Sequence, residues 1–220
     1  MIGQILAFFL PWGLRRRVLS RFCGFSIDPT ARIGFSVIKA RQVILGPHAR
    51  IGHLTFIKGI SRLELGEHAL LGNLNWVTAV PEGNPHHYKH LPDRKADFTI
   101  ERHAAVTHRH MIDCTGSVRI GAFTTVAGWY TQFISHSFDF RRARQDAQPI
   151  DIGSHAFVGS RCVVLKGARL PDKCVLSAGS VFDGKDAGGE HGLFRGNPAV
   201  REGELPADLG YFTRKEGFIE

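Results

Sequence analysis

The chain has 220 residues, 43% of them hydrophobic, and carries a net charge of +8. This length accommodates one solenoid domain with caps, and the positive charge is compatible with nucleic acid, an anionic membrane or a phosphorylated ligand. The sequence contains no nucleic-acid-binding signature and its basic residues are not interleaved with aromatic ones, so we predict no nucleic-acid partner.

Residues 1–26 are predicted to form a helical cap. Residues 5–14 are apolar and are followed by four arginines, Arg15, Arg16, Arg17 and Arg21. The apolar stretch is shorter than the roughly twenty residues that a transmembrane helix needs, and no signal-peptide cleavage site follows it. We therefore predict a cytoplasmic protein whose N-terminal helices cover the first coil of the fold. A compatible interpretation is an amphipathic segment in peripheral contact with the inner face of the membrane.

A six-residue repeat occupies residues 27–184. Two aliphatic residues stand six positions apart in each unit, and the fifth position is small. This period is neither helical nor that of a simple alternating strand, and it predicts short strands separated by tight corners. Such units bury their apolar side only by stacking, so we predict an all-β solenoid. The aliphatic pairs are Ile27/Ile33, Leu45/Ile51, Leu65/Leu71, Ile100/Val106, Ile120/Val126, Ile152/Val158 and Val164/Leu170.

Two insertions interrupt the coils, at residues 81–97 and 137–148. Both begin at the same position of their coil, so they are expected at one corner of a triangular prism, two coils and about 10 Å apart. The coil between them carries residues 110–116 near this corner. We predict that the functional site lies here, because binding loops concentrate where a regular scaffold is interrupted. Residues 185–220 are predicted to form a C-terminal tail.

No metal site is predicted from the twelve histidines. Four of them, His48, His68, His103 and His155, directly precede the small corner residue of their unit and are interpreted as corner residues. The four cysteines show no C-x-x-C spacing and are expected to be reduced thiols.

The repeat, the second insertion and the tail together resemble the left-handed β-helix acetyltransferases of the hexapeptide-repeat superfamily. The resemblance covers about residues 27–201, and its order of motifs looks like the branch that O-acetylates sugars and surface polysaccharides. The motifs are TQFISHSFD (131–139), PIDIG (149–153), FVGS (157–160), LSAGSV (176–181) and GNPA (196–199).

The resemblance implies a left-handed coil, a homotrimer with sites between subunits, and acetyl-CoA as co-substrate with no permanently bound cofactor. The residue that matches the family's catalytic histidine is His136. As a neutral imidazole it would take a proton from the acceptor hydroxyl while the oxygen attacks the thioester. Asp113 and Asp139 are candidates to orient it, and Asp113 is favoured because a rigid coil can aim it. A carboxylate from a neighbouring subunit is the other option.

Further site residues follow from the same resemblance. Small residues would let backbone groups approach the pantetheine arm, and cations would bind the phosphates. The tail departs from the family pattern, because Asp183-Gly184-Lys185 replaces the usual Thr-Lys, so Arg141, Arg142 and Arg144 are alternative phosphate ligands. The candidates for acetyl-CoA are Gly159, Ser160, Ala178, Gly179, Lys185, Arg195 and Arg201, and those for the acceptor are His110, Asn75, Trp76 and Arg141.

The predicted function is acetyl-CoA-dependent O-acetylation of a saccharide hydroxyl in surface polysaccharide biosynthesis. Two alternatives stay open. One is an acyltransferase acting on an amine or a small non-sugar acceptor. The other is a non-catalytic or carbonic anhydrase-like β-helix, for which His86, His87 and His90 are the histidines to consider as zinc ligands.

Overall fold

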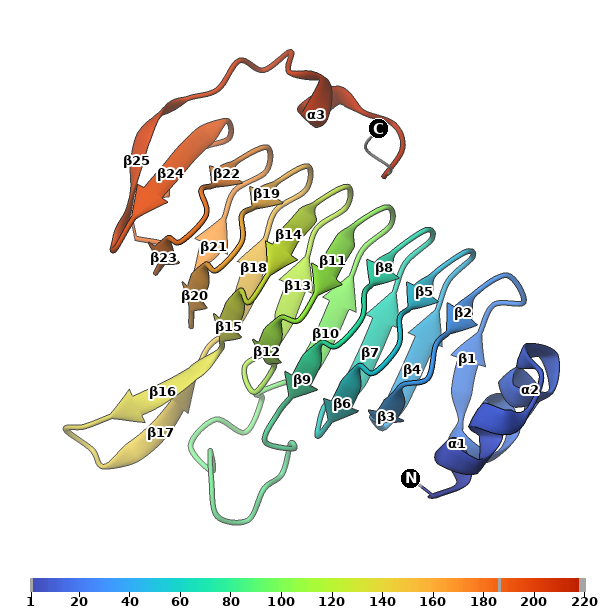
Figure 1. Cartoon of the computed structure of the whole chain (residues 1–220). Coiled ribbons are helices and arrows are strands. Elements are labelled where there is room, and N and C mark those ends of the chain that lie inside the picture. The colour runs from blue at the N-terminus through green and yellow to red at the C-terminus, as the bar shows by residue number, and fades with distance from the viewer. Residues whose placement is uncertain (1, 186, 218–220) are drawn as a thin grey trace.

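The computed structural model, which describes residues 2–185 and 187–217, is a triangular prism of seven stacked coils (Figure 1). Each coil contributes one short strand to each of three sheets, and the coil-to-coil pairing is parallel throughout. The coils form a left-handed β-helix, as predicted.

The three sheets are named in the order in which the chain visits them. The first contains β1 (Phe25–Ile27), β4 (Gln42–Leu45), β7 (Arg62–Leu65), β10 (Asp97–Ile100), β13 (Val118–Ile120), β18 (Ile150–Ile152) and β21 (Arg169–Leu170). The second contains β2 (Arg32–Ile33), β5 (Arg50–Ile51), β8 (Leu70–Leu71), β11 (Ala105–His108), β14 (Thr125–Trp129), β19 (Phe157–Val158), β22 (Val175–Leu176), β24 (Gly192–Gly196) and β25 (Ala199–Glu204). The third contains β3 (Val37–Lys39), β6 (Phe56–Lys58), β9 (Trp76–Thr78), β12 (Met111–Asp113), β15 (Gln132–Ile134), β20 (Val163–Leu165) and β23 (Val181–Phe182).

The core is a set of ladders of aliphatic side chains along the prism axis. In the first sheet Ile27 pairs with Leu45, and Leu45 pairs with Leu65, as the repeat predicts. The two leucines are at most 2% exposed. Burial of one such side chain contributes about 1.5–3 kcal/mol to the free energy of folding. These short strands bury their side chains by stacking on the neighbouring coils.

At the first corner, where the chain passes from the first to the second sheet, the predicted small residues are buried. Ala31 and Ala49 are 0% exposed. From the second coil onward, the residue before the small corner residue adopts a left-handed backbone, for example His48 with φ of 57°. The rings of this position stack along the axis at 4.6–4.9 Å, so the histidines assigned to corners do lie at a corner. The stack runs through His48, His68, His103, Phe123 and His155.

At the second corner, between the second and third sheets, a ladder of buried side chains holds successive coils together. We call it the polar ladder. Asn75 Oδ1 accepts the backbone N–H of His110 at 2.9 Å, and His110 Nδ1 accepts that of Thr131 at 3.1 Å. The same pattern links most members to the next coil, so these side chains satisfy backbone groups that the tight corner leaves unpaired. Its members, each at most 3% exposed, are Ser36, Thr55, Asn75, His110, Thr131, Cys162 and Ser180.

The N-terminal cap consists of α1 (Ile2–Leu6), the 3₁₀ turn η1 (Ala7–Phe9) and α2 (Trp12–Cys23). Helix α2 ends at Gly24, whose φ of 69° is the left-handed conformation that glycine favours at a helix C-terminus. The buried Arg15 side chain donates to the carbonyl oxygens of Ile33 and Gly34 and so ties the cap to the first coil. In the described part of the chain, no helix has the length and apolar character to cross a membrane.

The C-terminal tail contains a hairpin and a short helix. Strands β24 and β25 form an antiparallel hairpin that extends the second sheet beyond the seventh coil. The chain then returns along the first corner (Figure 1), where α3 (Gly210–Thr213) lies. There the Tyr211 hydroxyl donates to the carbonyl of Ala156 at 2.8 Å.

Candidate active site

Both insertions emerge at the third corner, where the chain passes from the third sheet to the next coil. The first lies between β9 and β10, and the second forms a hairpin of β16 (His136–Asp139) and β17 (Arg144–Ala147). Strand β12 lies between β9 and β15 in the third sheet, so the two insertions flank one coil, as expected (Figure 1). Their bounds differ by one residue from the prediction, because Asp97 already pairs with Arg62 as the first residue of β10 and His136 opens the hairpin.

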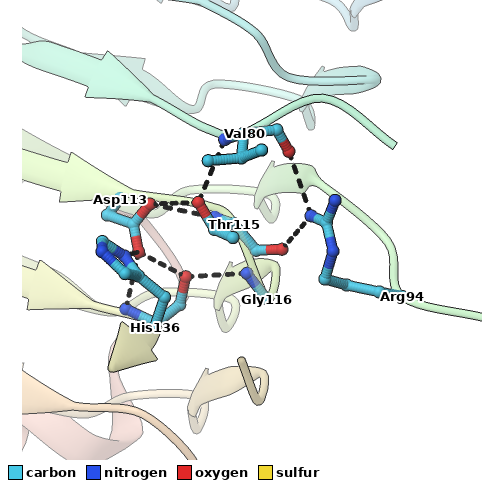
Figure 2. A network of polar contacts seen from close by, with 7 residues as sticks. Val80, Arg94, Asp113, Thr115, Gly116 and His136 are labelled. Carbon is cyan, nitrogen blue, oxygen red and sulfur yellow. Dashed lines mark hydrogen bonds and ion pairs between the residues drawn. The ribbon is translucent and has the colours of Figure 1, made fainter. Parts of the chain in front are cut away.

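Asp113, the last residue of β12, collects hydrogen bonds at this corner (Figure 2). Its Oδ1 accepts from the hydroxyl and backbone N–H of Thr115, at 2.6 and 3.2 Å. Its Oδ2 accepts from the hydroxyl and backbone N–H of Ser135, at 2.8 and 3.0 Å. These donors fix the carboxylate in one orientation.

The imidazole of His136 is held by the same carboxylate. Its Nδ1 lies 2.7 Å from Asp113 Oδ2, and the two side chains are 37% and 17% exposed. Since an ionised carboxylate can only accept, Nδ1 carries the proton and Nε2 presents a lone pair. No group among the described residues bonds to Nε2. This tautomer and orientation are those of a general base that a carboxylate positions.

Each partner shifts the pKa of the other. The hydrogen bond that His136 donates to Asp113 raises the pKa of His136, with a smaller opposing effect of burial. Burial acts to raise the pKa of Asp113, but the hydrogen bonds from His136, Thr115 and Ser135 together lower it below its usual value. The pair is therefore built around an ionised aspartate.

Arg94, which the sequence analysis did not identify, anchors the first insertion to this site. Its guanidinium donates to the carbonyl oxygens of Thr115 and Val80 (Figure 2). It also donates to the carbonyl oxygen of Pro81. The backbone N–H of Val80 in turn donates to the Thr115 hydroxyl at 3.1 Å. The loop over residues 81–96 is thus connected to the residue that fixes Asp113.

Tyr88 is a second residue that the sequence analysis missed. It is 5% exposed, its ring packs under Arg94 with the guanidinium 4.5 Å from the centroid, and its buried hydroxyl has no hydrogen-bond partner among the described residues. It lines a cavity of about 300 Å³ between the two insertions, together with Phe138 and Gln145. Burial, followed by the charge of Asp113, raises the pKa of Tyr88 to about 12, so the hydroxyl keeps its proton.

Three of the predicted residues lie away from this arrangement. Asp139 accepts the backbone N–H groups of Arg141 and Arg142 at the far end of the hairpin, and does not contact His136. Asn75 and His110 belong to the polar ladder and are at most 1% exposed. The prediction that these two contact the acceptor therefore needs correction, because both side chains are used inside the corner.

The other acceptor candidates are exposed. Trp76 is 54% exposed on the outer face of the third sheet, where it packs on Phe56 with ring centroids 4.9 Å apart. Arg141 is exposed at the tip of the hairpin. Neither lines the cavity beside Tyr88.

Four of the candidate acetyl-CoA residues, Gly159, Ser160, Ala178 and Gly179, lie at the second corner of the last two coils. Ala178 and Gly179 are exposed there, beside Ser160. Gly159 is buried, and a Cβ at this position would lie 2.5 Å from the backbone nitrogen of Ala178, so glycine is required for the coils to approach. This corner and the His136 corner are opposite edges of the third sheet.

The candidate phosphate-binding cations already have partners in the chain. Lys185 pairs with Asp183 at 3.2 Å, and Arg195 pairs with Glu202 at 3.2 Å. Arg201 donates to backbone carbonyls in residues 187–190 and so holds that loop.

The histidines of the first insertion do not assemble a metal site. His86, His87 and His90 line the cavity beside Tyr88. Within residues 2–185 and 187–217, no group of three or more metal-binding side chains has the geometry to hold an ion.

Residues 149–183, which begin coil six, match the family described as the hexapeptide repeat of succinyl-transferase. The same repeat continues through all seven coils.

Solved structures include distant neighbours of this chain. A polysialic acid O-acetyltransferase is 15% identical and aligns over 82% of this chain and 84% of its own, with a TM-score of 0.50. A hexapeptide-repeat acetyltransferase from Vibrio cholerae is 16% identical over 93% and 88%, with a TM-score of 0.45. An N-acyltransferase from Bacillus cereus, in complex with coenzyme A and a dTDP-linked amino sugar, is 10% identical over 87% and 89%, with a TM-score of 0.49. Among curated proteins, no sequence matches the chain.

Proposed function

We propose that this protein transfers an acetyl group from acetyl-CoA to a saccharide hydroxyl in surface polysaccharide biosynthesis. The observation that carries the proposal is the His136–Asp113 pair, at 2.7 Å, whose Nε2 lies between two long insertions and receives no bond from the described residues. The match of residues 149–183 to the hexapeptide repeat of succinyl-transferase supports an acyl-CoA co-substrate. The cavity beside Tyr88, between the same insertions, supports a site for a bulky acceptor.

In the proposed reaction, His136 Nε2 takes the proton of the acceptor hydroxyl while its oxygen attacks the thioester carbonyl carbon. The tetrahedral intermediate collapses with cleavage of the carbon–sulfur bond, and the imidazolium returns the proton to the leaving thiolate. The products are an acetyl ester and CoA. Asp113 stabilises the imidazolium between these two transfers, as the raised pKa of His136 requires.

We also propose that the protein acts as a homotrimer. The candidate acetyl-CoA residues and His136 lie at opposite edges of the third sheet, and a neighbouring protomer would join the second corner of one chain to the third corner of another. An apolar surface on this sheet and its second corner supports such contact, since large exposed apolar patches mark interaction sites. It comprises Leu54, Leu74, Trp76, Met111, Trp129 and Tyr130, which are 42–67% exposed.

The test of the reaction is release of CoA thiol from acetyl-CoA with a panel of neutral saccharides, amino sugars, serine and simple amines. We expect turnover with a saccharide whose product is an ester. Turnover restricted to amines would establish the alternative acceptor class, and an absence of both CoA binding and turnover would contradict the proposal.

The test of the assembly is light scattering on the wild-type protein and on Trp76→Glu. We expect a trimer that the charged residue weakens, with loss of transfer in the dissociated form. A wild-type monomer with full activity would contradict the trimer.

A further inference from the structure

The outer surface of the N-terminal cap is apolar although the fold does not bury it. The cap packs on the first coil through other residues, such as Leu19, which is 2% exposed. Phe9 and Phe22 are by contrast 88% and 79% exposed. Nothing in the packing of the prism accounts for two phenylalanines in water at this end of the molecule. Among the cap residues whose burial is described, the exposed large apolar side chains are Ile5, Leu6, Phe9, Leu10, Leu14 and Phe22.

The same cap is purely cationic. Residues 1–27 include four arginines and no aspartate or glutamate. Arg15 and Arg16 donate to backbone carbonyls of the first coil. Arg17 and Arg21 are exposed, lie one turn apart on α2, and have no acidic partner among the described residues. They follow Leu14 and precede Phe22 on the outer surface of the helix, so charge and apolar area are adjacent.

A groove of about 470 Å³ adjoins this surface where the cap meets the first coils. Trp12 and Leu10 line its apolar part, and Arg32 and Arg50 line its cationic part. The buried indole N–H of Trp12 has no acceptor among the described residues. The groove therefore offers apolar contact and cations, the combination that an anionic lipid headgroup and its chain would use.

We propose that the N-terminal cap binds the surface of an anionic lipid bilayer. The exposed phenylalanines and leucines enter the headgroup boundary, and Arg17 and Arg21 contact anionic headgroups, the usual arrangement of an interfacial amphipathic helix. Charge complementarity selects this occupant, because two copies of the cap would bring together arginines without any acid to neutralise them. The cap lies at the end of the prism, apart from the insertions of the third corner (Figure 1).

The experiment is cosedimentation of the full chain with phosphatidylcholine vesicles that contain or lack phosphatidylglycerol. We expect binding to the anionic vesicles that weakens as salt is added. The double variant Phe9→Ser, Phe22→Ser should lower the partition coefficient at least about tenfold. The double variant Arg17→Gln, Arg21→Gln should lower it about tenfold on anionic vesicles and leave weak binding to neutral vesicles unchanged.

Matched controls lie on the hairpin of the third corner. Phe140 is 91% exposed, and Arg141 and Arg144 are exposed cations. Phe140→Ser and the pair Arg141→Gln, Arg144→Gln remove the same groups elsewhere and should leave vesicle binding unchanged. Equal losses in the controls and in the cap variants would overturn the proposal, as would wild-type protein that stays in the supernatant. A cap variant that changes the molar mass in solution would assign the surface to a second copy instead.

Discussion

His110 and His136 occupy two corners of the same prism, on successive coils, and their surroundings give them opposite properties. At the second corner, His110 is 0% exposed and both ring nitrogens are bonded. At the third corner, His136 is partly exposed, and within the described part of the chain its ring bonds through Nδ1 alone, to a carboxylate. The environment that the corner provides, and not the residue type, decides which histidine is suited to proton transfer.

The hydrogen bonds of His110 fix its charge. Nδ1 accepts the backbone N–H of Thr131, so it carries no proton, and Nε2 donates to the Thr107 hydroxyl, which itself donates to carbonyl oxygens. Protonation of Nδ1 would break the bond to Thr131 inside the core. Burial accordingly lowers the pKa of His110 to about 4, whereas the hydrogen bond that His136 donates to Asp113 raises the pKa of His136.

The largest effect is expected for His136→Ala. Loss of a general base lowers turnover by about 10²–10⁴-fold, while acetyl-CoA binding and the fold should persist because the four bonds from Thr115 and Ser135 still hold Asp113. Steady-state thiol release and CoA titration measure the two quantities. Retention of more than about a tenth of the wild-type rate would exclude His136 as the base.

His110→Ala should reverse this pattern. It removes a buried ring and leaves the backbone N–H of Thr131 unpaired, so the free energy of unfolding should fall by about 2–4 kcal/mol. Transfer per folded molecule should stay within a few-fold of wild type, because His110 does not reach the third corner. Denaturant unfolding, with activity normalised to folded protein, checks the prediction. A hundredfold loss of turnover at unchanged stability would refute it.

Asp113→Asn should have an intermediate effect. Asn can still accept from His136 but cannot stabilise the imidazolium, so we expect a loss of about 10–100-fold in kcat. Because the neutral ring is the reactive form, the wild-type rate should rise with pH through the raised pKa of His136. Removal of the carboxylate should move this limb to lower pH, and a limb that does not move would show that Asp113 does not set the pKa.

The coil register could be predicted from sequence because each unit must turn one aliphatic side chain inward. The ladder from Ile27 through Leu45 to Leu65 follows directly from that requirement. The shared corner of the insertions follows from the same counting. The same counting predicts that His136 and Asp113 lie at one corner, and the structure shows the contact between them. The role of this contact in catalysis stays a prediction.

The polar ladder could not be predicted, since its members share no residue type. Ser, Thr, Asn, His and Cys all fill the second corner by satisfying backbone groups of the next coil. Without a shared residue type, the sequence does not reveal that Asn75 and His110 have this structural role, and it instead suggests that they contact the acceptor. The conformation of the first insertion could not be predicted either. Arg94 orders it by donating to the carbonyl oxygens of Val80, Pro81 and Thr115, and no local sequence pattern connects these residues.

The smallest predicted effect, Tyr88→Phe, tests whether the third corner also supplies the acceptor's hydrogen-bond donor. The Tyr88 hydroxyl is buried without a partner among the described residues. Its removal should therefore leave stability unchanged or raise it by about 1 kcal/mol, since an unsatisfied polar group is lost. If the hydroxyl binds the acceptor, kcat/KM for the saccharide should nevertheless fall about tenfold, with acetyl-CoA affinity unchanged.

The matched control is Tyr211→Phe, at the first corner. Its hydroxyl donates to the Ala156 carbonyl at 2.8 Å, so its loss should reduce stability by about 1 kcal/mol and leave transfer intact. Thermal unfolding and saccharide kinetics are measured on both variants. Tyr88→Phe should lower kcat/KM without a loss of stability, and Tyr211→Phe should lower stability without a loss of kcat/KM. A Tyr88→Phe protein that is less stable and equally active would show that this hydroxyl has a structural partner and no role at the acceptor.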